Sequence, residues 1–93
     1  MPYIRVSRAQ FDPAVGDQIS GVVTDLRSAL QKLPGLQHHL LGLDLQGGKG
    51  VAISIFDTRE HAQFTREALG EVISRVQAVG MRMEAPEVYE VTS

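Results

Sequence analysis

The feature that most constrains the fold of this chain is the order in which its hydrophobic periodicities follow one another. Stretches rich in β-forming residues occupy 3–11, 36–45, 51–57 and 87–92, whereas apolar residues recur at helical spacing over 13–33 and 58–79. This β-α-β-β-α-β order in 93 residues predicts a single α+β domain spanning 1–93. It favours a ferredoxin-like arrangement, in which both helices cover one face of a small antiparallel sheet.

Short local signals predict where the helices begin and end. Asp12-Pro13 combines a good N-cap with a proline suited to the first helical position, and Pro34-Gly35 predicts the end of that helix. The second helix is predicted to start at a capping box formed by Asp57 and Glu60 and to continue without a break to Gly80.

A tight hairpin turn is predicted at Gly47-Gly48, because glycine accepts the positive φ angles that such turns need. With these two glycines as the loop, His39 lies opposite Phe56 and His38 lies opposite Asp57. A phosphate-binding loop is disfavoured here, since the glycines join two strands and no helix N-terminus follows them.

Both faces of the predicted hairpin are apolar. One face carries Leu40, Val51, Ile53 and Ile55, and the other carries Leu41, Leu43, Leu45, Ala52 and Phe56. The helices cover only one of these faces, and a bare apolar face is unfavourable in a monomer. The sequence therefore predicts a homodimer in which two copies pack their bare faces together. Which face meets the helices stays open at this point.

Composition argues against several classes of function. The chain has no cysteine, which removes disulfides, thiol nucleophiles and cysteine-ligated metals together. A net charge of −2 without a basic cluster disfavours binding to nucleic acid. With no signal-like segment and no long apolar run, we expect a cytoplasmic protein that does not associate with membranes.

Two segments resemble the antibiotic-biosynthesis-monooxygenase-like domains of the dimeric α/β-barrel superfamily. One is Leu33-Pro-Gly-Leu36, which runs into a strand, and the other is Ala52-Ile-Ser-Ile-Phe-Asp-Thr-Arg-Glu-His-Ala62, a strand that ends in an aromatic residue before a helix. The likeness covers nearly the whole chain. It implies two identical subunits whose sheets form a barrel, with a cleft between helices and sheet for a small, often aromatic ligand.

The same resemblance disfavours haem degradation. Haem-degrading members use an asparagine, a tryptophan and a histidine at positions that fall on Ser7, Phe56 and roughly Arg66 here, and none of the three matches. A metal site is also disfavoured, because His38 and His39 are adjacent in a strand and point to opposite faces, while His61 is expected to be exposed without a partner. We expect no metal and no cofactor.

Histidine, arginine and serine residues supply the candidate site. His39, or alternatively His38, is the candidate catalytic base, because an unperturbed imidazole titrates near neutral pH. Arg5 and Ser7 share one face of the first strand and are candidates for stabilising negative charge on a ligand. The alternative for Arg5, and the favoured one, is a neighbouring carboxylate.

Phe56 and Ser54 complete the set of candidate ligand contacts on the third strand. Phe56 would stack on an aromatic ligand, and Ser54 is two residues away on the same face.

Two functions are compatible with this pattern. The first is a cofactor-independent, monooxygenase-like enzyme that acts on an aromatic or polyketide-like substrate. The second is a non-catalytic ligand-binding or dimerisation module, which is favoured by the lack of a matched catalytic set and by the presence of only five aromatic residues. A polar cleft of about 300 Å³ or more would indicate the enzyme, and a cleft filled by apolar side chains would indicate the module.

Overall fold

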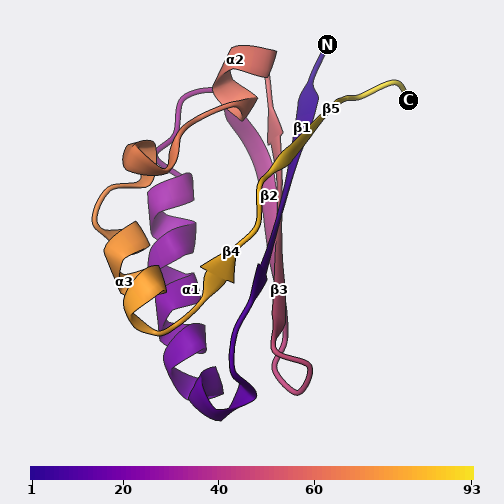
Figure 1. Ribbon diagram of the computed structural model, residues 1–93. Helices are drawn as coiled ribbons and strands as arrows, with labels where there is room; N and C mark the ends of the chain where they lie inside the picture. Colours follow the sequence, from indigo (N-terminus) through magenta and orange to yellow (C-terminus); the bar gives the residue numbers. More distant parts are fainter.

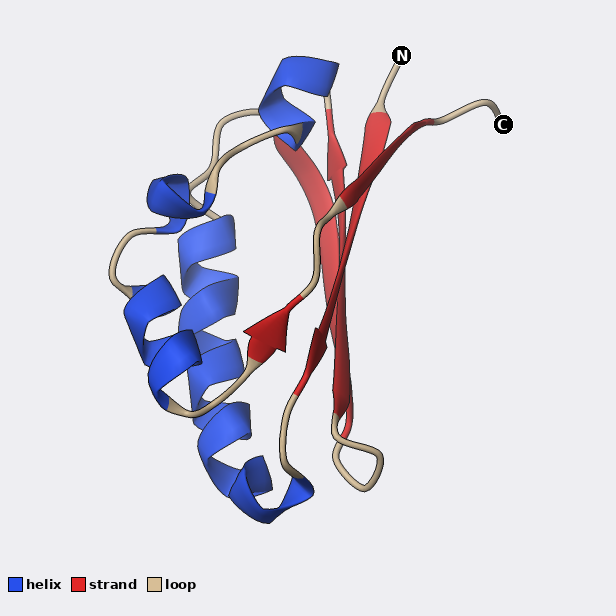
Figure 2. Ribbon diagram, viewed as in Figure 1, coloured by secondary structure: helices blue, strands red, loops and turns tan.

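The sheet and the helices form two layers, and every helix lies on the same side of the sheet (Figure 1, Figure 2). The computed structural model describes all residues 1–93. Its elements are β1 (Tyr3–Gln10), a 3-10 turn η1 (Pro13–Val15), α1 (Gly16–Leu30), β2 (Leu36–Asp44), β3 (Lys49–Phe56), α2 (Arg59–Ala62), a 3-10 turn η2 (Arg66–Leu69), α3 (Val72–Ala78), β4 (Arg82–Met83) and β5 (Glu87–Glu90). The predicted α+β, ferredoxin-like subunit is confirmed.

The sheet is antiparallel, with the strand order β2-β3-β1-β4, and β5 also pairs with β1. The predicted last strand therefore exists as two short pieces, both of which lie along β1. β4 pairs with its end at Ala9 and Gln10, and β5 pairs with its beginning between Tyr3 and Val6. This places β1 inside the sheet, with β3 on its other side.

The first helical segment begins where the sequence predicts. The Asp12 side chain accepts a hydrogen bond from the Ala14 amide at 2.9 Å, and Pro13 occupies the first position of η1. α1 then buries one stripe of side chains against the sheet and α3: Ile19, Val22, Leu26 and Leu30. This stripe is the centre of the hydrophobic core.

The predicted continuous second helix is wrong, because the chain forms three short pieces there: α2, η2 and α3. The backbone leaves the helical path after Ala62. There Arg5 donates hydrogen bonds to the carbonyl oxygens of Ala62 and Phe64, at 2.9 and 3.0 Å. Gly70, at φ 70°, separates η2 from α3. The predicted capping box is also corrected: Thr58 caps α2 by accepting from the His61 amide at 3.1 Å.

The register predicted for the hairpin is wrong by two residues. Asp44 pairs with Lys49, so the loop contains the four residues 45–48, and the Asp44 side chain accepts from the Gly47 amide at 2.9 Å. His39 therefore lies opposite Ser54, and His38 lies opposite Ile55. Because side chains alternate with a period of two, a slip of two residues leaves the side chains of both strands on their predicted faces, and of the apolar residues assigned to a face only Leu45 moves into the loop.

Alanine substitutions at two glycines with positive φ test the described hairpin turn. Gly48 has φ +68°, and an added Cβ would lie 2.2 Å from the Phe11 carbonyl oxygen, whereas Gly80, which ends α3, has φ +80° and open space around it. Gly80→Ala should cost only the left-handed strain, about 1 kcal/mol of unfolding free energy, and Gly48→Ala at least about 2 kcal/mol. Chemical denaturation of both variants checks the difference, and equal losses would contradict the described turn.

Candidate functional site

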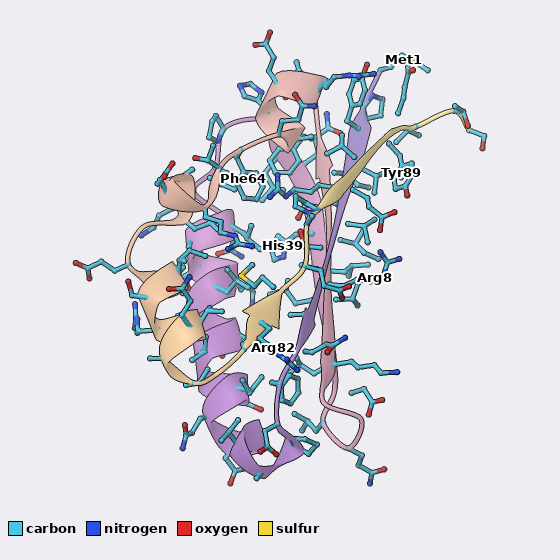
Figure 3. All side chains as sticks on the ribbon, in the orientation of Figure 1. Met1, Arg8, His39, Phe64, Arg82 and Tyr89 are labelled. Atoms are coloured by element: carbon cyan, nitrogen blue, oxygen red, sulfur yellow. The ribbon has the colours of Figure 1, made fainter.

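Three neighbouring strands place Arg5, Ser54 and His39 in a row on the side of the sheet that faces the helices. Ser54 of β3 is opposite Arg5 of β1 and also opposite His39 of β2. Arg5 is 8% exposed and Ser54 is 2% exposed, whereas His39 is half-buried. Figure 3 shows His39 between the sheet and α1. The row therefore lies within the interior of the subunit.

Arg5 holds the segment that follows α2. Its Nη1 donates to the carbonyls of Ala62 and Phe64, and its guanidinium carbon lies 3.8 Å from the centre of the Phe64 ring. The favoured alternative for Arg5, a carboxylate neighbour, is wrong, because the ion pairs of the structure are Arg8–Glu87, His61–Asp57 and Arg75–Asp25. Backbone carbonyls and an aromatic face take the place of a counter-ion.

Two nitrogen atoms in this row are buried without a hydrogen-bond partner in the protein: Nε of Arg5 and Nδ1 of His39. Such atoms are uncommon in folded proteins, because each loses its hydration on burial. The pKa of Arg5 is lowered, first by burial and then by the nearby positive charge of Arg66. A ligand oxygen that is negatively charged or accepts a hydrogen bond would stabilise the buried Arg5 guanidinium, because it would give Nε a partner.

Two small adjoining cavities lie between sheet and helices. We call the first the Arg5 pocket; it measures about 40 Å³ and is lined by polar residues and by apolar residues of the helix layer: Arg5, Ser7, Ser54, Phe64, Arg66, Glu84, Leu26, Leu30 and Leu69. The second also measures about 40 Å³, and the two share Ser7, Leu26, Ala52 and Met83. Each is far smaller than the roughly 300 Å³ of a small-molecule site, so a ligand has to widen them.

The candidate residues are distributed unequally around these cavities. Arg5, Ser7 and Ser54 line the Arg5 pocket. His39 faces the same layer but lines neither cavity. His38 lies on the opposite face of the sheet and is exposed. The structure thus resolves which histidine faces the helices.

The aromatic residue that lines the Arg5 pocket is Phe64, not Phe56. Phe56 is 0% exposed and packs against Phe64 with ring centres 5.6 Å apart. Phe64 falls within the continuous helix predicted over 58–79, and Arg66 enters the sequence analysis only as a mismatch to a haem ligand. No local signal distinguished them, because their position depends on the break after α2.

His61 has a partner, contrary to expectation. Its Nδ1 lies 2.6 Å from Oδ1 of Asp57, and this hydrogen bond is the main cause that lowers the pKa of Asp57. The predicted position of His38 opposite Asp57 is wrong, because His38 pairs with Ile55. Gly35 packs directly against the pair of His61 and Asp57. A Cβ added at Gly35 would lie 2.2 Å from the Asp57 carboxylate, so a larger residue does not fit there.

The larger depressions lie at the surface and contain none of the candidate residues. One of about 440 Å³ lies at the hairpin end of the sheet, and its lining includes the exposed charged residues Arg8, Asp44, Lys49 and Glu84. Two others, of about 390 and 490 Å³, lie around residues 80–83 and 57–60. No group of three or more histidine or acidic side chains is arranged to hold a metal ion. None of the helices has the length and apolar character needed to cross a lipid bilayer.

Solved structures with the same fold come from several organisms. SnoaB, a cofactor-independent oxygenase from Streptomyces nogalater, is 15% identical over 99% of this chain and 94% of its own, with a TM-score of 0.73. A Deinococcus radiodurans protein assigned to the antibiotic biosynthesis monooxygenases is 13% identical over 98% and 93%, with a TM-score of 0.77. MupZ from Pseudomonas fluorescens is 10% identical over 94% and 69%, with a TM-score of 0.77.

At these identities the likeness concerns the fold. No protein-family model and no curated protein sequence matches the chain. The resemblance to antibiotic-biosynthesis-monooxygenase-like domains is confirmed at that level.

Proposed function

We propose that this chain binds a small aromatic or polyketide-like molecule between its sheet and its helices and oxidises it as a cofactor-independent, monooxygenase-like enzyme. The observation that carries the proposal is the row of Arg5, Ser54 and His39, in which a buried cation and an imidazole each keep one unpartnered nitrogen. SnoaB, which shares the fold, is a cofactor-independent oxygenase.

The chemistry follows from the residue types in the row. Neutral His39, with its proton on Nε2, accepts the proton of a phenolic hydroxyl at Nδ1. The resulting phenolate gives one electron to dioxygen, and the substrate radical and superoxide then combine to form a peroxide on a ring carbon. Cleavage of the O–O bond leaves one oxygen atom on the ring as a carbonyl and releases the other as water, so the substrate supplies all four electrons and the protein supplies no redox group. The positive charge of Arg5 stabilises the phenolate, and Ser7 or Ser54 donates a hydrogen bond to its oxygen. For this reaction the Arg5 pocket has to widen across the sheet, from Ser54 on β3 to His39 on β2.

His39→Ala is expected to lower oxygen uptake with 1,4-dihydroxynaphthalene by about 100-fold relative to the unsubstituted protein, because general base catalysis contributes at least that factor. His38→Ala is the matched control, since this neighbouring histidine lies on the opposite face and its loss should leave the rate unchanged. Uptake is measured with an oxygen electrode after subtraction of autoxidation. A folded His39→Ala variant with undiminished turnover rejects the role of His39.

A non-catalytic ligand-binding or dimerisation module is the second candidate, and the observation that favours it is the small volume of the two cavities, about 40 Å³ each. The same compound separates the candidates. Binding seen by nuclear magnetic resonance without oxygen uptake above autoxidation indicates a ligand-binding module. Neither binding nor uptake indicates a purely structural domain.

We also propose that the functional unit is a homodimer formed through the sheet face that the helices leave bare. This face carries Ile4, Val6, Leu40, Val51, Ile53, Ile55 and Tyr89. Leu40 is 70% exposed and Tyr89 is 51% exposed in the single chain. Figure 3 shows Tyr89 and Arg8 pointing away from the helices on this side. A second copy would remove these apolar side chains from water, and a two-fold axis lets one surface serve both subunits.

A further inference from the structure

We propose that the Arg5 pocket binds the carboxylate of an aromatic acid, and that Arg66 is the second cationic contact for this group. The proposal takes from the proposed function only the place of the ligand, not its reaction. The carboxylate would lie at the end of the pocket formed by Arg5 and Arg66, whereas the phenolic hydroxyl of the proposed reaction lies at the His39 end, on the other side of Ser54. Arg5 then contacts the carboxylate directly and acts on the phenolate only through its charge.

The charges around the pocket are unbalanced. Arg5 and Arg66 both line it, and neither takes part in an ion pair. The one acidic residue in the lining is Glu84, which is exposed and makes no ion pair. Arg66 is near enough to contribute to the lowered pKa of Arg5. Two like charges at one partly buried pocket repel each other, and an anion between them removes that cost.

Both guanidinium groups have unused hydrogen-bonding capacity. A guanidinium carries five N–H donors, and the hydrogen bonds of Arg5 to Ala62 and Phe64 use Nη1 alone, while its buried Nε has no partner. Arg66 makes a single long hydrogen bond, from Nη2 to the Met83 carbonyl at 3.4 Å. A carboxylate is planar and accepts two parallel N–H bonds, which suits such donors better than a neutral phenol does.

The rest of the lining specifies an apolar, aromatic body for the same ligand. The Phe64 ring lies 3.8 Å from the Arg5 guanidinium, and apolar side chains of the helix layer, Leu26, Leu30 and Leu69, form further wall. An aromatic ring beside Phe64 would gain stacking and burial, while its acid group meets the arginines. The chemical class is therefore an aromatic carboxylic acid.

The test compares 2-naphthoate with 2-naphthamide, a neutral molecule of nearly the same shape, by chemical-shift titration of the whole chain. We expect 2-naphthoate to bind at least about tenfold more tightly, since a charge-assisted hydrogen bond is worth about that factor. Arg66→Ala should remove most of this preference by weakening the naphthoate alone, and Arg66→Lys should keep part of it. Arg27→Ala, which removes the same charge from the exposed side of α1, is the matched control and should change neither affinity.

The outcomes separate this proposal from the proposed function. Equal binding of naphthoate and naphthamide overturns the carboxylate site, even where 1,4-dihydroxynaphthalene is oxidised. Equal weakening of both ligands by Arg66→Ala, in a variant whose melting temperature is unchanged, also overturns it, because the effect is then one of shape. Selective loss of naphthoate binding supports the site, even where no oxygen uptake occurs and the proposed reaction fails.

Discussion

Replacing Arg5 by methionine is expected to lower the free energy of unfolding by about 2–4 kcal/mol, a large share of the stability of a domain of this size. The substitution keeps a long side chain but leaves the carbonyls of Ala62 and Phe64 without their donor. Each carbonyl left unsatisfied costs about 1–3 kcal/mol. Removal of a buried charge that has no counter-ion offsets part of this loss, so the net value falls below the sum.

The location of the effect is as informative as its size. Arg5 connects β1 to the chain between α2 and η2, so Arg5→Met should speed amide hydrogen exchange over residues 63–70 more than over α1. Arg8→Met is the matched control, because Arg8 is on the same strand, is exposed and pairs only with Glu87. Its cost should stay below about 1 kcal/mol. Equal exchange over both segments in Arg5→Met would mean that Arg5 does not hold the break.

The sheet faces could be predicted from the sequence, because they depend only on alternation. The loop of the hairpin is two residues longer than predicted, which shifts the pairing by two residues, yet Leu40 and Ile53 still lie on one face and Leu41 and Ala52 on the other. An error of an even number of residues in the register leaves the face of each side chain unchanged. The same shift changes every cross-strand partner. The sequence therefore predicts Phe56 opposite His39, where the structure has Ser54.

The second helix is interrupted twice, and only one interruption has a local signal: Gly70, which separates η2 from α3. The break after Ala62 could not be predicted from the sequence, for a different reason. The apolar spacing over 58–79 is helical, and Leu69, Val72 and Val76 are buried as that spacing predicts. The break, however, depends on Arg5, which lies 57 and 59 residues from the two carbonyls it binds. Local patterns carry no information about a contact at that separation. The positions of Phe64 and Arg66 at the pocket follow from the same break, so the sequence alone does not predict these two residues of the site.

Ile53→Lys is expected to convert a dimer into a monomer at micromolar concentration. Ile53 lies on the middle strand of the bare face, opposite Val6 on one side and Leu40 on the other. A lysine there stays hydrated in the single chain and should cost it less than about 1 kcal/mol. In the dimer the same residue would be buried without a counter-charge, at about 3–5 kcal/mol for each subunit.

Two-fold symmetry introduces the unpaired charge twice, so the dissociation constant should rise by more than about 10⁴-fold. Ala78→Lys, which adds the same charge at an exposed position at the end of α3, should leave the association unchanged. Sedimentation equilibrium of the three proteins gives the molecular mass directly. A monomeric unsubstituted chain contradicts the homodimer itself, whereas a dimer that survives Ile53→Lys places the interface elsewhere. In either case Leu40 and Tyr89 would need another partner, because a face with this much exposed apolar surface is unfavourable in water.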